Sequence, residues 1–306
     1  MDATLTRTAR AAAHRDALAA PAPAAPLPFE SPLGAWSEPL LHEPFARNGY
    51  ARMRDLDTPR LEHEAREMEA FIARFVARTH DVFGPLAYTG DRLDNWSRRW
   101  EFPYVWWNLR QGSMERVLDA GSGFSFFSYL LASAGATVSA ADIDPKLGPV
   151  YERANAATGR CVDYRVSPIE ALVWPDATFD AVACVSVLEH APRRLDAIAE
   201  FARVLRPGGR LVMTWDISLS RDSDVRWEDA CLLLDRLQEH FEPVHELDLY
   251  RPTDLLTTDR MLAAEKWRLS WRPHRNPLRR FASWLKNGSH FHSLAVLGTT
   301  WRKKDA

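Results

Sequence analysis

The stretch Val-Leu-Asp-Ala-Gly-Ser-Gly-Phe-Ser-Phe at residues 117–126 decides the fold of this chain. A short apolar run ends in Asp119 and is followed almost at once by Gly121 and Gly123. This pattern predicts a buried strand that turns sharply into a helix, because glycine lets the backbone turn and approach a ligand without a Cβ in the way. Phe126 stands where a dinucleotide fingerprint has its third glycine, and the Gly-Lys-Ser/Thr of a phosphate loop is absent, so pyrophosphate recognition is disfavoured.

Downstream of this turn, short apolar runs alternate with segments of helical periodicity. The alternation predicts βαβ units and an α/β fold, a Rossmann-like doubly wound sheet with helices on both faces. The expected strands are residues 137–141, 161–166, 179–187, 210–214, 243–249 and 293–301, and the clearest expected helices are residues 194–205 and 228–240.

The part of the chain before residue 116 has a different character. Residues 1–28 are rich in Ala and Pro and lack the continuous apolar stretch of a secretory signal, so we expect a disordered tail. Residues 29–115 are predicted to form an N-terminal helical lobe, because their apolar residues recur at steps of three or four. The core domain would then be residues 116–306, with an irregular insertion at about 250–292.

The composition is that of a globular protein, with 46% apolar residues, 26% charged residues and a formal net charge of −2 over 306 residues. This balance argues against nucleic-acid binding as the main function. Apolar runs are too short for a transmembrane helix. Three cysteines lie far apart, which argues against a disulfide framework or a zinc site and favours a reducing cytoplasm.

Several motifs follow the glycine turn in a fixed order. Asp142 ends the second expected strand, and then come Phe179-Asp180, the run Ser-Val-Leu-Glu-His at residues 186–190, and the run Leu-Arg-Pro-Gly-Gly-Arg-Leu-Val at residues 205–212. Together these motifs resemble the core of the class I S-adenosylmethionine-dependent methyltransferases. The resemblance implies a seven-stranded sheet whose last strand is antiparallel, with S-adenosylmethionine bound over the carboxyl ends of the first strands.

Carried over position by position, the resemblance implies a cofactor site around the glycine turn. Asp119, Gly121 and Gly123 would hold the methionine end of the cofactor. Asp142 would bind the ribose hydroxyls, and Ile143 would lie against the adenine. A carboxylate at the end of the second strand is also what a doubly wound domain uses to bind a ribose.

The segment that would contact the adenine amine departs from the family pattern. Many relatives have an acidic residue after the third strand, where this chain has Ser167 and Pro168. The Ser167 hydroxyl and the backbone of Ile169 are the predicted substitutes. The complete predicted cofactor set is Asp119, Ala120, Gly121, Ser122, Gly123, Asp142, Ile143, Ser167, Pro168, Ile169 and Ser186.

The candidate catalytic residue is His190. Methyl transfer from a sulfonium mainly requires that the acceptor be oriented and water excluded, but a hydroxyl acceptor also needs a base. Imidazole titrates near physiological pH, which suits His190 to this role. The alternative is that His190 only shapes the pocket, since many relatives carry Leu-Glu-His here. Ser186 replaces the acid that metal-binding relatives use, so no metal site is predicted.

Two aromatic or basic regions are candidates for acceptor binding. We predict contacts from Trp100, Tyr104, Trp107 and Trp215, although the aromatic segment before the first strand is equally consistent with a packing interface. Residues 266–304 carry many Lys and Arg and no acidic residue. That stretch suits a phosphorylated or acidic substrate, an anionic membrane surface or RNA, or else it is an ordinary solvated face.

These observations favour a methyltransferase that acts on a hydroxyl of a small molecule, a glycan or a secondary-metabolite intermediate. An N-methyltransferase, an RNA methyltransferase and a non-catalytic binding protein on the same scaffold are the alternatives. Neither the acceptor nor the oligomeric state is predicted, because substrate choice in such folds comes from additions to a shared core.

Overall fold

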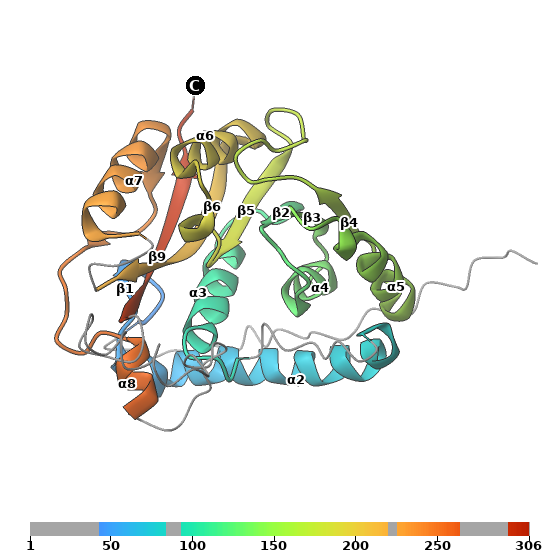
Figure 1. Ribbon diagram of the computed structural model, residues 1–306, viewed down its shortest axis with the longest axis horizontal. Helices are drawn as coiled ribbons and strands as arrows, with labels where there is room; N and C mark the ends of the chain where they lie inside the picture. Colours follow the sequence, from blue (N-terminus) through green and yellow to red (C-terminus); the bar gives the residue numbers. More distant parts are fainter. Residues whose placement is uncertain (1–42, 84–92, 220–224, 264–292, 306) are drawn as a thin grey trace, which may run out of the picture.

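The computed structural model describes residues 43–83, 93–219, 225–263 and 293–305. A mixed sheet forms the centre, and helices cover both of its faces (Figure 1). The predicted tail, most of the predicted insertion and most of the basic stretch lie outside the described residues. The α/β class and the doubly wound arrangement predicted from the sequence are confirmed.

The sheet has nine strands, in the order β4-β3-β2-β5-β6-β9-β1-β8, with β7 also paired to β9. Strands β2 to β6 run parallel, and β9 is antiparallel to β6, β1 and β7, as predicted for the last strand. The strands are β1 (Asn48–Tyr50), β2 (Arg116–Ala120), β3 (Thr137–Asp142), β4 (Val162–Val166), β5 (Phe179–Val185), β6 (Leu205–Ser218), β7 (Phe241–Pro243), β8 (Leu247–Asp248) and β9 (Leu294–Lys303).

The number of strands corrects the prediction of seven. The short strands β1 and β8 extend the sheet beyond β9, through pairs such as Gly49 with Gly298 and Asn48 with Leu247. Residues 48–50 were predicted to lie in a separate lobe, and residues 243–249 were predicted to form one strand. Strands of two or three residues carry too little periodicity to be recognised from sequence. In the structure β1 pairs with the edge of β9, and β8 pairs in turn with β1.

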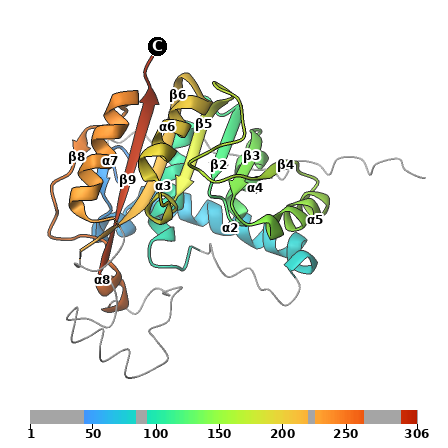
Figure 2. The ribbon, with the colours of Figure 1, turned by 45° about the horizontal axis from the view of Figure 1, so that its top comes forward.

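Four helices cover one face of the sheet and two cover the other. The first face carries α2 (Pro59–Phe83), α3 (Arg98–Arg110), α4 (Phe126–Ser133) and α5 (Gly148–Thr158), and the second carries α6 (Arg194–Val204) and α7 (Trp227–His240). Figure 2 shows α6 and α7 together on the side of the strands away from α2. The short helix α8 (Thr258–Ala263) packs near β9.

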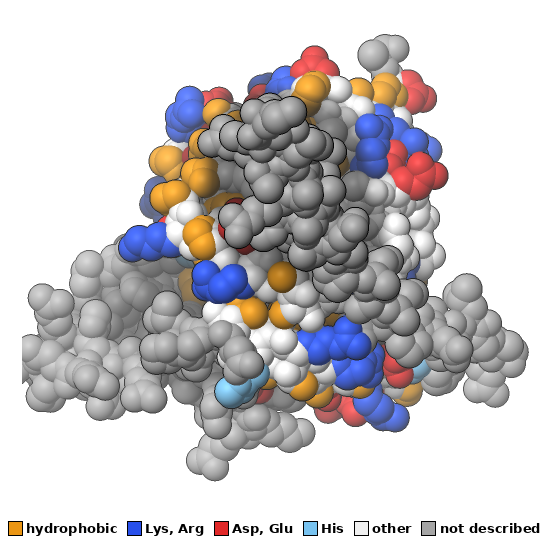
Figure 3. All heavy atoms as spheres, turned by 90° about the vertical axis from the view of Figure 1, so that its right-hand side faces the viewer, with side chains coloured by type: hydrophobic (Ala, Val, Ile, Leu, Met, Phe, Trp, Pro, Cys, Tyr) orange, Lys and Arg blue, Asp and Glu red, His pale blue; other side chains and the backbone are white. Residues whose placement is uncertain are grey.

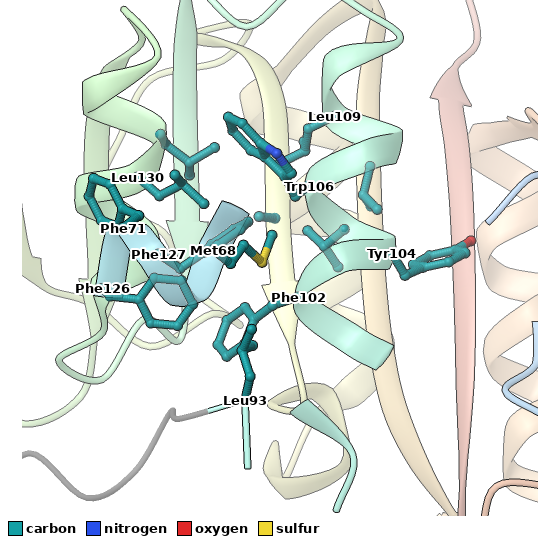
Figure 4. Close-up of a cluster of buried hydrophobic side chains, with 14 of the residues drawn as sticks. Met68, Phe71, Leu93, Phe102, Tyr104, Trp106, Leu109, Phe126, Phe127 and Leu130 are labelled. Carbon is teal, nitrogen blue, oxygen red and sulfur yellow. The ribbon is translucent and has the colours of Figure 1, made fainter. Parts of the chain in front are cut away.

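Helices of the predicted N-terminal lobe pack against the rest of the core. In α2 the buried residues recur at helical spacing, as in Met68, Phe71 and Phe75, and they pack against α3 and α4. Figure 4 shows Met68 and Phe71 with Phe102 of α3 and with the aromatic side chains at the start of α4. Burial of this apolar face stabilises a helix that its sequence alone favours only weakly.

The exposed surface reflects the near-zero net charge of the chain. On the face seen in Figure 3, Lys and Arg side chains stand among Asp and Glu side chains. Many of these charges pair locally, as Arg165 does with Asp163 at 3.0 Å on β4. Among the described side chains of this face, positive and negative charges are therefore mixed, and neither sign forms a large patch.

Candidate functional site

The turn between β2 and α4 is built on two glycines with left-handed backbone conformation. Gly121 has φ of 72°, and Gly123 has φ of 52°. A Cβ on Gly121 would also come within 2.8 Å of the Cβ of Val187, whereas a Cβ on Gly123 would meet no atom within 4 Å. Gly121 is therefore required by both conformation and space, and the backbone at Gly123 faces an open volume.

Asp142 is joined to this turn by its carboxylate. Its Oδ2 atom accepts a hydrogen bond of 2.9 Å from the N–H of Gly123, and its Oδ1 atom accepts one of 3.0 Å from the N–H of Asp144. The helix cap at this point is Asp144, which accepts from the N–H of Lys146 at 2.9 Å. Asp142 is thus oriented by two backbone groups while each carboxylate oxygen keeps further capacity to accept.

A second carboxylate, Asp119, lies below the turn and is 4% exposed. The Ser128 hydroxyl donates to its Oδ2 atom at 2.5 Å. Tyr151 of α5 approaches from the same side, with its hydroxyl 3.0 Å from both the Ser122 hydroxyl and the Gly123 carbonyl oxygen. Burial raises the pKa of Tyr151 well above its ordinary value, so this hydroxyl keeps its proton and remains a donor to the turn.

These groups surround a cavity of about 140 Å³ at the carboxyl ends of β2, β3 and β5. This is the place where open α/β sheets bind their ligands. Among the described residues, Arg98 is the one basic residue that lines the cavity. The lining consists of Arg98, Phe102, Asp119, Gly121, Ser122, Gly123, Ser125, Asp142, Val185, Ser186 and Val187.

A buried carboxylate from α3 contacts two of the residues that line the cavity. Glu101 is fully buried, and it accepts hydrogen bonds from the hydroxyls of Ser186 at 2.5 Å and Thr214 at 2.9 Å. Its other oxygen pairs with the Arg98 guanidinium. Burial by itself would raise the pKa of Glu101, but the Arg98 charge and the Ser186 hydrogen bond hold that pKa below its ordinary value. Glu101 is therefore ionised at neutral pH.

A second buried carboxyl group, Glu189, lies in the turn after β5. Its side chain is inaccessible to solvent, and neither carboxyl oxygen has a hydrogen-bond partner. Burial and the nearby charge of Asp216 raise the pKa of Glu189 well above its ordinary value. The guanidinium of Arg194 fixes the turn itself, donating to the carbonyl oxygens of Leu188 at 3.3 Å and Glu189 at 2.5 Å. Burial therefore favours the protonated form of Glu189.

The predicted cofactor residues divide into two groups. One group, Asp119, Gly121, Ser122, Gly123, Asp142 and Ser186, lines the cavity. Ala120 is buried in β2, and Ile143 is 71% exposed immediately beyond Asp142. All of these residues lie at or near the carboxyl ends of β2, β3 and β5, and the order of the sequence motifs indicates where those strands end.

Ser167, the predicted adenine contact, lies in the loop that follows β4. The Ser167 side chain is fully buried, and its hydroxyl accepts from the N–H of Val173 and donates to the carbonyl oxygen of Ala171, both at 3.3 Å. In this arrangement the hydroxyl holds its own loop together. Pro168 is exposed, and Ile169 is 5% exposed.

The predicted base His190 lies at the surface. Its side chain is exposed at the end of the short 3-10 helix η3 (Leu188–His190), outside the residues that line the cavity. The backbone N–H of His190 donates to the carbonyl oxygen of Val187, which belongs to the cavity wall. A turn of this length places adjacent side chains on different sides, so Glu189 points inward while His190 points outward.

The four predicted acceptor contacts all make packing contacts within the fold. Trp100 and Tyr104 lie against β9, where a Cβ on Gly298 would come within 2.6 Å and 2.9 Å of their rings. Figure 4 shows Tyr104 projecting from α3 toward β9, away from the aromatic cluster. Trp215 is buried on the other face, and Trp107 is partly buried beside Phe45. None of the four lines the cavity.

Arg98, Glu101 and Tyr151 are site residues that the sequence analysis did not select. The spacing of Arg98 and Glu101 places them on one side of a helix, and that spacing was readable in the sequence. Nothing local connects Glu101 with Ser186, because 85 residues separate them. Within the described ranges, no helix has the length and apolar character to cross a membrane, and no cluster of three or more His, Cys, Asp or Glu could hold a metal ion.

The matches to known proteins fall on the part of the chain that contains the glycine turn. Residues 118–213 match a family model described as a methyltransferase domain. The ubiquinone biosynthesis O-methyltransferase of Xylella fastidiosa is 42% identical over 100 residues, which are 32% of this chain and 41% of that protein. The protein of the same name from Xanthomonas axonopodis pv. citri is 41% identical over 32% of this chain and 42% of its own length.

Among solved structures, the cyclase SpnF has a similar fold, with a TM-score of 0.50 and 17% identity over 77% of this chain and 96% of its own. The curated relatives are matched over about two fifths of their length, 41% and 42%. The shared region contains the glycine turn, Asp142 and the turn after β5. The helices α2 and α3 lie outside the region matched by the family model.

Proposed function

We propose that this chain binds S-adenosylmethionine and methylates a hydroxyl of a small molecule, because residues 118–213 match a family model described as a methyltransferase domain. The observation that carries the proposal is the hydrogen bond between the Asp142 carboxylate and the backbone N–H of Gly123 in the glycine turn. A carboxylate oriented toward open space beside a left-handed Gly123 suits a ribose lying against exposed backbone.

The residues of the cavity fit the parts of this cofactor. Asp142 would accept hydrogen bonds from the ribose hydroxyls, and the exposed Ile143 offers apolar surface for the adenine. A cavity of about 140 Å³ takes the amino-acid end. Arg98 would bind its carboxylate, and Asp119 would attract its ammonium group.

When bound, the cofactor supplies an electrophilic methyl group attached to a sulfonium. The chain contributes binding, orientation and the exclusion of water, which is most of what an in-line displacement needs. Phe102, Val185 and Val187 give the cavity an apolar wall next to its charged groups. The proposed acceptor of the hydroxyl proton is His190, three residues beyond Val187.

Oxygen is proposed as the acceptor atom because the curated relatives are O-methyltransferases by name. Acceptors of a glycan or secondary-metabolite pathway remain within the proposal, since substrate choice in such folds comes from additions to a shared core. The fold does not fix the reaction, as the cyclase SpnF illustrates. Incubation with labelled cofactor and phenolic or sugar-bearing hydroxyls, followed by product analysis, separates O-methylation from N-methylation.

The cofactor site is tested by calorimetric titration with S-adenosylhomocysteine. Replacing Asp142 with Ala should weaken binding about 100-fold, because two hydrogen bonds to a charged group are lost. Asp163→Ala is the matched control, since Asp163 is an exposed carboxylate on the neighbouring strand β4 and pairs with Arg165. A folded wild-type protein that does not bind, or an Asp142→Ala variant with unchanged affinity, would overturn the proposal.

A further inference from the structure

We propose that Glu101 is a positioning residue for the methionine end of the cofactor. It orients Arg98 toward the cofactor carboxylate and holds Ser186 in its left-handed conformation at the end of β5. The inference rests on the proposed function and deepens it. It also gives α3, which lies outside the matched domain, a defined part in the site.

Glu101 joins three separate elements through one buried carboxylate. One oxygen accepts from the hydroxyls of Ser186, after β5, and Thr214, in β6, at 2.5 Å and 2.9 Å. The other oxygen pairs with Arg98 in the first turn of α3. An ionised group buried in this way is weak evidence for stability, because apolar residues of similar volume would stabilise the same place as well or better. The contacts of Glu101 with Arg98 and Ser186, which line the cavity, instead indicate a role in the cavity.

Ser186 needs a partner because of its backbone. Its φ is 50°, and it is one of two non-glycine residues with positive φ in the described chain. Such conformations are costly and are kept where the surroundings hold them in place. The N–H of Ser186 donates to the carbonyl oxygen of Thr214 at 2.9 Å, and its hydroxyl donates to Glu101.

The conformation of Ser186 affects the cavity through its neighbours. Val185 and Val187 line the cavity, and Val187 packs so closely on Gly121 that no Cβ fits there. A change at Ser186 would therefore shift the wall against the glycine turn. By holding the strained backbone of Ser186, Glu101 therefore keeps Val187 in place against the glycine turn.

Arg98 depends on Glu101 for its orientation. One guanidinium nitrogen pairs with Glu101, and the carbon of the guanidinium lies 5.9 Å from the centre of the Phe102 ring. A guanidinium held in this way presents its remaining donors in a fixed plane, which suits the two oxygens of a carboxylate. Without the Glu101 charge, the long side chain of Arg98 regains several rotamers.

The experiment compares two ligands that differ only at the amino-acid end. S-adenosylhomocysteine carries the amino acid, and methylthioadenosine has the same adenosine and sulfur without it. We expect Glu101→Gln to weaken binding of S-adenosylhomocysteine about 10- to 100-fold while changing methylthioadenosine affinity less than about twofold. Glu64→Gln is the matched control, because Glu64 is also buried and pairs with Arg110 at the other end of α3.

The double variant Arg98→Met/Glu101→Gln tests whether Glu101 acts through Arg98. It leaves no unpaired charge in the interior, so it folds even where a single variant does not. Its loss of S-adenosylhomocysteine affinity should be smaller than the sum of the losses of the two single variants, because part of the effect of Glu101 passes through Arg98.

Equal losses for both ligands in Glu101→Gln would assign Glu101 a purely structural role and overturn the inference. Unchanged affinity for S-adenosylhomocysteine would overturn it as well, as would additive losses in the double variant. If wild-type protein binds neither ligand, the proposed function itself fails, and that result is distinct from the others.

Discussion

The neutral state of Glu189 predicts an unusual dependence of stability on pH. Glu189 has an ordinary pKa of 4.5 in the unfolded chain and a pKa well above this value in the folded protein, because of burial and the charge of Asp216. A raised folded-state pKa favours the protonated form in the folded protein. The contribution of Glu189 to stability is therefore fully present below pH 4.5 and is lost as the pH rises toward the folded-state pKa.

Replacing Glu189 with Gln removes this dependence while keeping the size and shape of the side chain. Each pH unit by which the folded-state pKa exceeds the ordinary value is worth about 1.4 kcal/mol of unfolding free energy. The variant should match wild type within about 1 kcal/mol at acidic pH, where both side chains are neutral. At pH 8 it should be more stable than wild type by at least about 1.4 kcal/mol.

Urea unfolding at pH 4.5 and at pH 8, followed by circular dichroism, measures the difference. Glu152→Gln is the control, because Glu152 is an exposed residue on α5. Its free energy of unfolding should follow that of wild type at both values. If the difference between Glu189→Gln and wild type is the same at pH 4.5 and pH 8, Glu189 is not a neutral buried acid and the reasoning is refuted.

Two further predictions concern the glycine turn. Gly121→Ala should lower the unfolding free energy by about 1–3 kcal/mol and abolish measurable binding of S-adenosylhomocysteine, because a Cβ clashes with Val187 and φ is 72°. If Gly121→Ala bound S-adenosylhomocysteine with wild-type affinity, the Val187 side chain would have moved to accommodate the added Cβ, and the prediction would fail. Tyr151→Phe removes the donor to the Gly123 carbonyl oxygen and should cost about 1 kcal/mol of stability. It should also weaken cofactor binding about fivefold by calorimetry, and equal affinities would limit Tyr151 to packing.

The residues of the cofactor cradle could be predicted from the sequence because they follow strands. Asp119, Gly121 and Asp142 stand at the ends of apolar runs, and parallel strands bring their carboxyl ends to one edge of the sheet. Ser167 also follows a strand, but its hydroxyl accepts a hydrogen bond from the backbone of its own loop. Short polar side chains often bond locally in this way, and sequence position does not reveal it.

The aromatic residues before β2 are a second case in which the sequence does not reveal what a side chain contacts. Trp100 and Tyr104 could have faced a ligand or the core, and composition does not distinguish the two. In the structure Trp100 is fully buried, and its indole N–H donates to Asp55 at 3.0 Å. A large ring on a helix next to a sheet is buried wherever the sheet leaves space, and here Gly298 leaves that space.

By itself the sequence determined the alternation of strands and helices in the core and the glycine turn after β2, whereas the antiparallel last strand was expected only from the resemblance. These features depend on patterns within about ten to twenty residues, where hydrophobic period and glycine decide the backbone. Only the tertiary structure decided that β1 joins the sheet, that Glu189 points inward while His190 points outward, and that Glu101 meets Ser186. Such contacts join residues far apart in the chain or depend on which side of a turn is buried, so they arise only when the helices pack against the sheet.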